Sequence, residues 1–198
     1  MTSEAPRRWR SFAFVSATVP DVLPLYRFFH TEFGDDTPSE ERMASWIRMC
    51  PSAFTLAVKS AELDLSSDER AIVGAYKSLP ITLAAVAQLE QGRVSGSRFE
   101  SQHIASNTTD VAAVYLGDVY SPDLLLRGGL REDLIKETVQ AIGERITPVY
   151  ARPFTNKGWK AMRRHGFIQV NNGSDELELR ALCKLADGRR LIDVLSRS

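Results

Sequence analysis

VAAVYLGDVYSPDLLLRGGLREDLIKETVQAIGER, residues 111–145, gives the strongest indication of the fold. Its first ten residues are almost continuously apolar, a pattern typical of a central strand that is buried on both faces. A Ser-Pro-Asp turn signal follows, and apolar residues then recur at helical spacing from about residue 131 to residue 145. We therefore predict a central strand, a turn that contains Gly128 and Gly129, and a helix.

The residues before this unit predict a strand followed by two helices. Residues 11–19 (SFAFVSATV) are rich in β-branched and aromatic side chains and end at a Pro-Asp turn. Two helical patterns follow, the first ended by Gly34 and the second capped by Ser39. Their apolar stripes indicate core residues, which we expect to be Phe29, Phe33, Met43 and Trp46. The next predicted elements are strands at 54–58 and 71–76, a helix at 83–90 and a polar connection at 93–109.

The residues after the central unit predict elements that complete a sheet. We expect a strand at 147–151, a helix at 156–165 that ends at Gly166, and a hairpin made from 167–170 and 177–182. The chain has 198 residues, of which 43% are hydrophobic, so we predict one α/β domain with a mixed central sheet over residues 1–198. Within it, we expect residues 1–10, which contain Arg7, Arg8 and Arg10, to be a basic terminal arm.

Charge and cysteine content exclude several classes of protein. Twenty-five Lys and Arg balance twenty-five Asp and Glu, so the strong positive field of a dedicated nucleic-acid-binding protein is absent. Cys50 and Cys183 lie far apart and outside any Cys/His cluster, so we expect no metal and a reducing cytoplasmic location. Pro20, Asp21 and Pro24 interrupt the apolar N-terminal stretch, so we expect no membrane span. A homodimer stays open as an alternative to a monomer.

The glycine pair indicates an anion site at a helix start. In the predicted turn, the N–H groups of Gly128, Gly129, Leu130 and Arg131 would point toward an anion, because the first turn of a helix leaves its N–H groups without partners. The side chains of Arg127 and Arg131 would add donors for phosphate. The alternative is a tight turn with solvated arginines.

Together with the order of elements, two patterns resemble the GNAT (Gcn5-related N-acetyltransferase) superfamily. VAAVYLGDVY followed by RGGLREDLI looks like the family's central strand and pyrophosphate-binding turn. TPVYARPFTNKGWKAMRRHGF, residues 147–167, is similar to the family's next strand and helix, including Asn156, Gly158 and the final Gly-Phe. The resemblance implies a GNAT-like acyl-CoA N-acyltransferase fold and acetyl transfer from acetyl-CoA to a primary amine of a small molecule or protein, by direct attack. It implies binding of acetyl-CoA by Val119, Tyr120, Arg127, Gly128, Gly129, Leu130, Arg131 and Asn156.

The sequence departs from the family pattern at three positions. Leu126 stands where the family has Arg or Gln, and Arg131 stands where it has a small residue. Met162 occupies the position of the tyrosine that acts as general acid toward the CoA thiolate in many relatives, and a thioether cannot donate a proton. The alternative reading is therefore a GNAT-like domain that has lost turnover and serves as a binding or regulatory module.

Other residues are candidates for the missing catalytic groups. Tyr120 ends the central strand, where the resemblance puts the thioester, and its phenol could protonate the thiolate. Asp118 and His103 are candidate bases, and histidine has the more suitable intrinsic pKa of about 6.5. A basic stretch could meet the CoA 3′-phosphate or an acidic partner, or form a solvated helix face; it consists of Lys157, Lys160, Arg163, Arg164 and His165.

Overall fold

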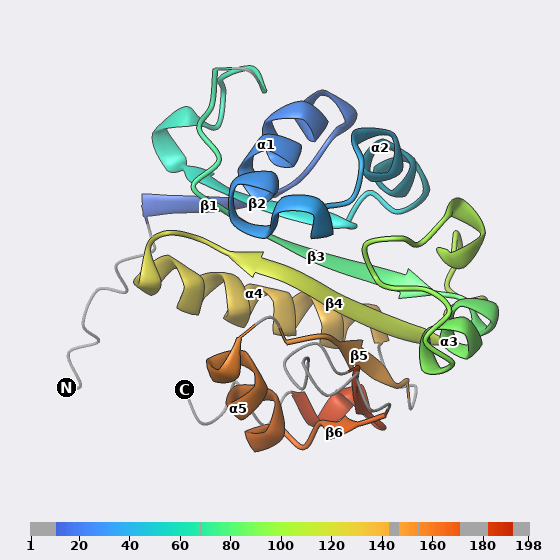
Figure 1. Ribbon diagram of the computed structural model, residues 1–198. Helices are drawn as coiled ribbons and strands as arrows, with labels where there is room; N and C mark the ends of the chain where they lie inside the picture. Colours follow the sequence, from blue (N-terminus) through green and yellow to red (C-terminus); the bar gives the residue numbers. More distant parts are fainter. Residues whose placement is uncertain (1–10, 68, 143–146, 154, 171–181, 192–198) are drawn as a thin grey trace. The chain divides into compact units, whose positions relative to one another are not determined.

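The structure is a computed structural model that describes residues 11–67, 69–142, 147–153, 155–170 and 182–191 (Figure 1). The predicted basic arm at residues 1–10 lies outside them. Two compact units alternate along the chain: Met1–Lys77 with Asp118–Leu134, and Ser78–Gly117 with Ile135–Ser198. The described helices include none with both the length and the apolar content to cross a membrane.

In the described part of the chain, seven strands form one mixed sheet in the order β1–β2–β3–β4–β5–β7–β6. The pairs β1–β2, β2–β3, β5–β7 and β6–β7 are antiparallel, whereas β4 and β5 run parallel from Val114↔Val149 to Leu116↔Ala151. This confirms the predicted α/β class with a mixed central sheet. The strands are β1 (Phe12–Ser16), β2 (Phe54–Lys59), β3 (Gly74–Ile81), β4 (Ala113–Tyr120), β5 (Val149–Ala151), β6 (Ile168–Gln169) and β7 (Cys183–Leu185).

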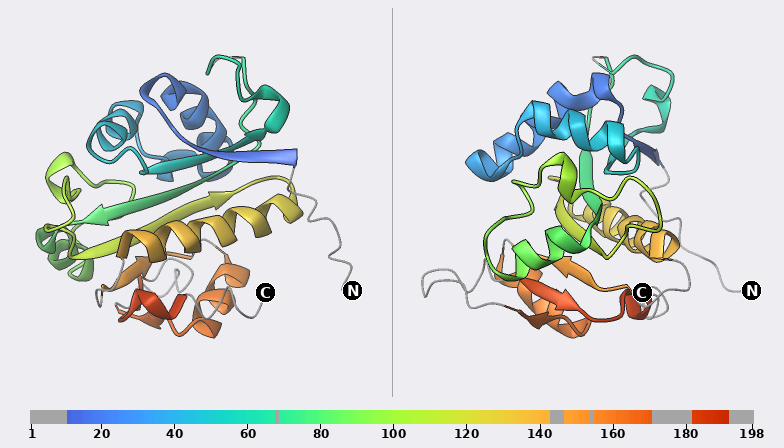
Figure 2. Two further views of the ribbon diagram at one scale, coloured as in Figure 1. Left: turned by 180° about the vertical axis from the view of Figure 1, so that it is seen from behind. Right: turned by 90° about the vertical axis from the view of Figure 1, so that its right-hand side faces the viewer.

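The first unit contains the two helices that the sequence predicts after the first strand. These are α1 (Val22–Phe33) and α2 (Glu40–Met49), and they lie side by side next to β1 and β2 (Figures 1 and 2). Gly34 ends α1 with a φ of 55°, a conformation that glycine adopts without steric penalty. The Ser39 side chain caps α2 by accepting the Arg42 N–H at 3.4 Å.

Of the four residues of these helices that the sequence assigns to the core, three have no exposed surface. They are Phe29, Met43 and Trp46, all at 0% exposure, and the Trp46 ring stacks on Phe54 with 6.0 Å between ring centroids. Phe33 differs, because it is half-buried and contacts Tyr120 as well as Phe29. It sits at the last turn of α1, where the helix leaves the core.

The second unit contains α3 (Leu83–Glu90), with the predicted bounds, and α5 (Asn156–Arg164). The buried Tyr150 of β5 donates its hydroxyl hydrogen to Glu90 at the end of α3, and Lys184 of β7 donates to the same carboxylate at 2.8 Å. The predicted strand within residues 167–170 is present as β6, but it pairs with Cys183–Leu185 and not with the predicted stretch 177–182. Residues 177–181 of the predicted hairpin lie outside the described part of the chain.

Two further predicted boundaries are wrong. Strand β3 runs from Gly74 to Ile81 and not over 71–76, because a buried lysine hides the apolar pattern. Helix α4 spans Leu124–Ile142 and begins seven residues before the predicted start at 131. Leu126, Leu130 and Leu134 recur every four residues and are all buried, so their burial outweighs the roughly 1 kcal/mol that each glycine costs inside a helix.

We expect Trp46→Ala to lower the free energy of unfolding by about 3–5 kcal/mol, because it removes a large side chain with no exposed surface. Urea denaturation measures the change. Leu83→Ala is the control, since Leu83 is 73% exposed and its truncation should change stability by less than about 0.5 kcal/mol. Equal stabilities of Trp46→Ala and the wild type would contradict the assignment of Trp46 to the core.

Candidate functional site

The candidate site lies in the first unit, where β4 ends and α4 begins. Strand β4 contains Asp118, whose φ of 55° is the only positive value for a non-glycine residue in the described part of the chain. Aspartate tolerates this left-handed conformation better than most residues, but such a conformation persists only where its surroundings hold it. The strand is therefore locally fixed just before its last residue, Tyr120.

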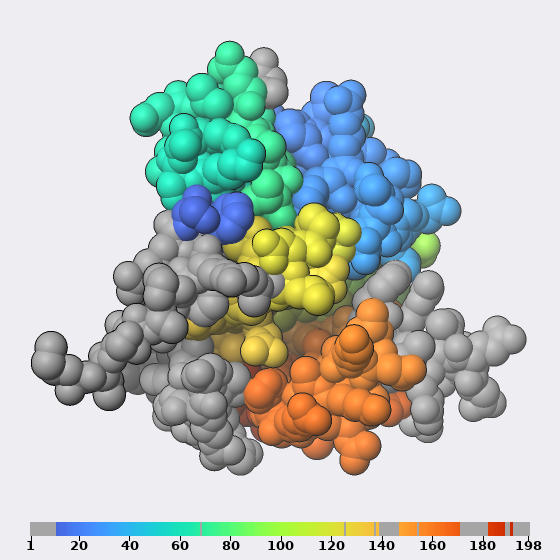
Figure 3. All heavy atoms as spheres, turned by 90° about the vertical axis from the view of Figure 1, so that its left-hand side faces the viewer, coloured from blue at the N-terminus to red at the C-terminus, as the bar shows by residue number. Residues whose placement is uncertain are grey.

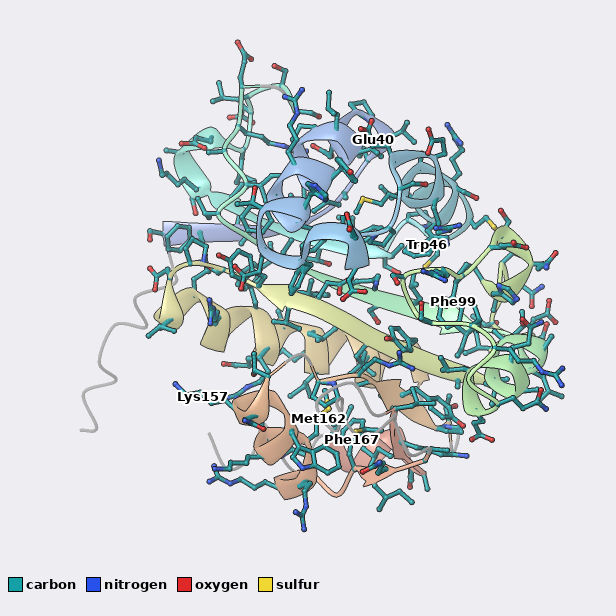
Figure 4. The ribbon with its side chains drawn as sticks, in the orientation of Figure 1. Glu40, Trp46, Phe99, Lys157, Met162 and Phe167 are labelled. Atoms are coloured by element: carbon teal, nitrogen blue, oxygen red, sulfur yellow. The ribbon has the colours of Figure 1, made fainter. Side chains whose placement is uncertain are left out.

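A buried lysine holds Asp118. Lys77 of β3 has 1% of its surface exposed, and its ammonium group forms an ion pair with the Asp118 carboxylate. The same ammonium lies 5.4 Å from the centre of the Trp46 ring (labelled in Figure 4), which gives it a cation–π contact from α2. The Asp118 side chain keeps 24% exposure, so one buried charge anchors a carboxylate that reaches the surface.

Tyr120 lies against the end of α1. Its ring centroid is 5.4 Å from that of Phe28 and 5.9 Å from that of Phe33, and the Arg127 guanidinium lies 5.2 Å from the ring centre. A hydrogen bond to Glu32 and partial burial raise the pKa of the Tyr120 phenol, against a smaller opposing effect of Arg127. The phenol is therefore protonated at neutral pH, and the Tyr120 side chain is half-exposed. In Figure 3 the surface of the end of β4 and the start of α4 (yellow) borders that of α1 (blue).

Ser121 fixes the short connection between β4 and α4. Its buried hydroxyl donates to the Val73 carbonyl at 2.8 Å and accepts the Asp123 N–H at 3.1 Å. Arg127 donates from Nε to the Ser121 carbonyl, so its side chain turns back toward Tyr120. Close packing on Gly74 confines the connection further, because a Cβ there would lie 3.3 Å from the Tyr120 carbonyl oxygen.

The helix start is not where the sequence places it. Gly128, Gly129, Leu130 and Arg131 lie inside α4, where each N–H bonds to the carbonyl four residues before it, and not in a turn. The Arg127 N–H already bonds to the Asp123 carbonyl at 3.0 Å, and the Leu126 N–H bonds to the Asp123 side chain at 3.3 Å. An anion at this helix start would meet residues 124–126 and a carboxylate, so these four amides cannot cradle it.

The arginine side chains remain suited to an anion. Arg127 and Arg131 are four residues apart, so they project from the same face of α4. Arg131 is exposed and Arg127 half-exposed, whereas Leu126 is buried at 1% exposure and belongs to the core. The exposed Val119 adds an apolar side chain at the end of β4. A role of Arg127, Arg131 or Val119 in binding acetyl-CoA stays a prediction.

The remaining predicted site residues lie in the second unit. His103 is not an accessible loop residue: it ends the 3-10 turn Ser101–His103, is 4% exposed, and its Nδ1 accepts the Glu100 N–H at 2.9 Å. This burial argues against its role as a base. Asn156 is the exposed first residue of α5, and Lys157 and Met162 also lie on α5 (Figure 4).

The basic stretch forms one exposed side of α5. Lys157, Lys160, Arg163 and Arg164 are all exposed, and the Arg163 guanidinium lies 5.8 Å from the centre of the Trp159 ring. His165 is the half-exposed residue that follows α5. A role of these residues or of Asn156 in binding a phosphate stays a prediction. Among the described residues, no group of three or more His, Cys, Asp or Glu side chains could hold a metal ion.

Several solved structures share this architecture. The loading GNATL domain of CurA from Lyngbya majuscula has a TM-score of 0.56 at 14% identity, covering 90% of this chain and 98% of that one. The chain has the GNAT fold. A second similar structure is Ard1 from Thermoplasma volcanium, with a TM-score of 0.51 at 8% identity, covering 88% of this chain and 95% of that one. A third is NAA60 from Arabidopsis thaliana in complex with acetyl-CoA, with a TM-score of 0.51 at 13% identity, covering 88% of this chain and 97% of that one. No family model and no curated protein sequence matches the chain.

Sequence reasoning missed three residues of this site. Lys77 stands in a stretch, KSLP, that indicates a turn as readily as a strand, and only the packing of Trp46 shows that it is buried. Phe28 and Glu32 lie off the apolar stripe of α1, so the helical pattern assigns them to solvent. No local signal relates them to Tyr120, which follows 88 residues after Glu32 in the sequence.

We expect Gly128→Ala to raise the free energy of unfolding by about 0.5–1 kcal/mol, because Gly128 lies inside α4 and a Cβ there meets no atom within 4 Å. The melting temperature should rise by about 2 °C. Gly34→Ala is the matched control: its Cβ also meets no atom, but the φ of 55° makes alanine unfavourable, so stability should fall. A fall for Gly128→Ala would place the glycine in a strained turn after all.

We expect Asp118→Asn to lower the free energy of unfolding by about 3 kcal/mol, because it leaves the buried Lys77 ammonium without its counter-charge. Asparagine tolerates the left-handed conformation, so the change isolates the charge. Lys77→Met combined with Asp118→Asn should recover most of the loss, since the buried charge is then absent. Urea denaturation measures all three proteins, and a double variant less stable than Asp118→Asn would contradict this account.

Proposed function

We propose that the protein is an acyl-CoA-dependent N-acyltransferase that transfers an acetyl group from acetyl-CoA to a primary amine by direct attack in a ternary complex. The observation that carries the proposal is the junction of β4 and α4 in a GNAT fold, where a protonated phenol, two arginines and an anchored carboxylate lie together. Such an enzyme works mainly by aligning the two substrates. The two free, buried cysteines suit a reducing cytoplasm.

In this proposal the arginine side chains hold the pyrophosphate of acetyl-CoA. Arg127 and Arg131 supply charge-assisted donors from one face of α4, which replaces the amide cradle that the helix start lacks. The Asp123 carboxylate beside the first turn disfavours an anion centred on the helix axis. This supports binding displaced along the helix, toward Arg131.

Tyr120 is the proposed acid. Met162 is in the second unit and has no proton to donate, whereas the raised pKa of Tyr120 keeps its phenol protonated at neutral pH. It can give that proton to the departing thiolate if the sulfur comes within hydrogen-bond reach. The amine acceptor is a small molecule or a protein.

A binding or regulatory module without turnover is the second candidate function. The observation that favours it is the early start of α4, which takes the amides of Gly128 and Gly129 into the helix. An acetyl-CoA site weakened in this way could bind without aligning the thioester. Calorimetric binding of acetyl-CoA with no acetyl transfer to any amine would support this function over the transferase.

We expect calorimetry to detect binding of acetyl-CoA to the wild type, and Arg131→Ala to weaken it by about 10–100-fold, the effect of losing one charge-assisted hydrogen bond. Lys136→Ala is the control, because it removes an exposed cation five residues further along the same helix. No heat with wild-type protein at millimolar ligand would contradict acyl-CoA binding. Equal losses in both variants would mean that the effect is general electrostatics and not contact with phosphate.

A further inference from the structure

Positive charge is concentrated in one stretch of the chain. Between Glu144 and Asp175 the sequence contains no acidic residue, but it contains six of the 25 Lys and Arg. The other 19 Lys and Arg and all 25 Asp and Glu lie outside this stretch, so the rest of the chain has a net charge of −6 although the whole chain is neutral. The neutral total therefore hides a strongly basic region.

Four of these six cations lie on α5. Lys157, Lys160 and Arg164 follow one another at spacings of three and four residues, so they lie on one side of the helix, and Arg163 borders them. All four side chains are exposed, and Figure 4 shows Lys157 projecting outward from α5. We call these four residues the basic face of α5.

The chain does not neutralise the basic face. No acidic side chain in the described part of the chain forms an ion pair with any of the four cations, and α5 itself contains no Asp or Glu. The Arg163 guanidinium lies over the Trp159 ring, 5.8 Å from its centre, which holds that side chain in place without pairing its charge. The four charges occupy about 10 Å of helix, so they repel one another with little screening by physiological salt. Such a surface gains free energy when negative charge covers it.

Two kinds of polyanion fit this face poorly. A nucleic acid extends far beyond one helix and would meet the rest of the chain, which carries the net charge of −6. An anionic membrane binds an amphipathic helix through exposed apolar side chains as well as through cations. On α5 the large apolar side chains, Trp159 and Met162, are half-buried, and Arg163 lies over the tryptophan ring. A short acidic segment needs the basic face alone.

We propose that the basic face of α5 is a docking surface for an acidic polypeptide segment of a partner protein. Each guanidinium offers two parallel N–H donors that match a carboxylate, and each ammonium offers a compact charge. In an extended segment, alternate side chains lie on one side about 7 Å apart, close to the roughly 5–6 Å between positions four apart on a helix. The partner therefore carries Asp or Glu at alternate positions. This surface is independent of the proposed transferase function.

The first experiment measures the fluorescence anisotropy of a labelled peptide in which Glu alternates with Ser. The wild type should bind it, less tightly as salt rises, and should not bind the same peptide with Gln in place of Glu. Lys160→Gln combined with Arg164→Gln should weaken binding by about 10-fold. Arg93→Gln combined with Arg98→Gln is the matched control, because it removes two exposed cations from another segment of the same unit and should change binding by less than about 2-fold. No binding by the wild type, or equal losses in the two variants, would overturn the proposal.

A charge reversal gives a result that misfolding cannot produce. Lys157→Glu, Lys160→Glu and Arg164→Glu together make the face acidic while leaving Arg163 on the tryptophan ring. This variant should lose the Glu peptide and should bind a peptide in which Lys alternates with Ser more tightly than the wild type does. Binding of the Lys peptide no tighter than in the wild type would contradict the assignment of the surface to α5.

Each alternative occupant of the basic face has its own readout. Saturating acetyl-CoA should leave binding of the Glu peptide unchanged, and displacement of the peptide would assign the face to the cofactor. Tighter binding of oligo(dT) than of the peptide would make the partner a nucleic acid, and sedimentation with phosphatidylserine vesicles would make it a membrane, if Lys160→Gln with Arg164→Gln abolishes either. A dimer in sedimentation velocity that the same variant dissociates would make the occupant a second copy of the chain. Any of these four results would overturn the proposal.

Discussion

A lysine ammonium buried under a tryptophan ring needs a counter-charge, and this requirement organises the centre of the first unit. Lys77 can remain in the core only because Asp118 turns toward it, and Asp118 turns by adopting a left-handed backbone conformation inside β4. That conformation breaks the regular alternation of the strand just before Tyr120. The position of the candidate catalytic phenol therefore depends on an ion pair two residues away and on the packing of Trp46 beneath it.

Three buried leucines of α4 limit how the candidate site can recognise a cofactor. Burying Leu126, Leu130 and Leu134 draws the helix start back to Leu124 and uses the amides of the glycine pair in helical hydrogen bonds. Those amides are therefore not free donors for an anion, although the local sequence predicts an anion site there. The same helix start, however, places the Arg127 guanidinium against the Tyr120 ring and on the same face of α4 as Arg131. In the proposed function, these two arginine side chains take the place of the backbone amides as phosphate donors.

The two carboxylates near Tyr120 show how environment divides similar groups between structure and chemistry. Asp118 and Glu32 carry the same functional group, but one compensates a buried cation and the other contacts solvent and a phenol. Loss of the Asp118 carboxylate would leave the Lys77 ammonium unpaired in the core, whereas Glu32 is exposed. Geometry alone, without any difference in side-chain chemistry, makes this division.

Local patterns in the sequence predict the order of the elements, the class of the fold and the caps of the helices. Periodicity and turn residues are local, so α1, α2 and α3, the end of α1 at Gly34 and the buried core of Phe29, Met43 and Trp46 follow from them. The start of α4, the burial of Lys77 and His103, and the contacts of Phe28 and Phe33 with Tyr120 follow only from the packing of the folded chain. The physical reason is that burial and pairing depend on residues far apart in the chain. A glycine pair signals a turn locally, but long-range packing of three leucines is worth more free energy than that preference.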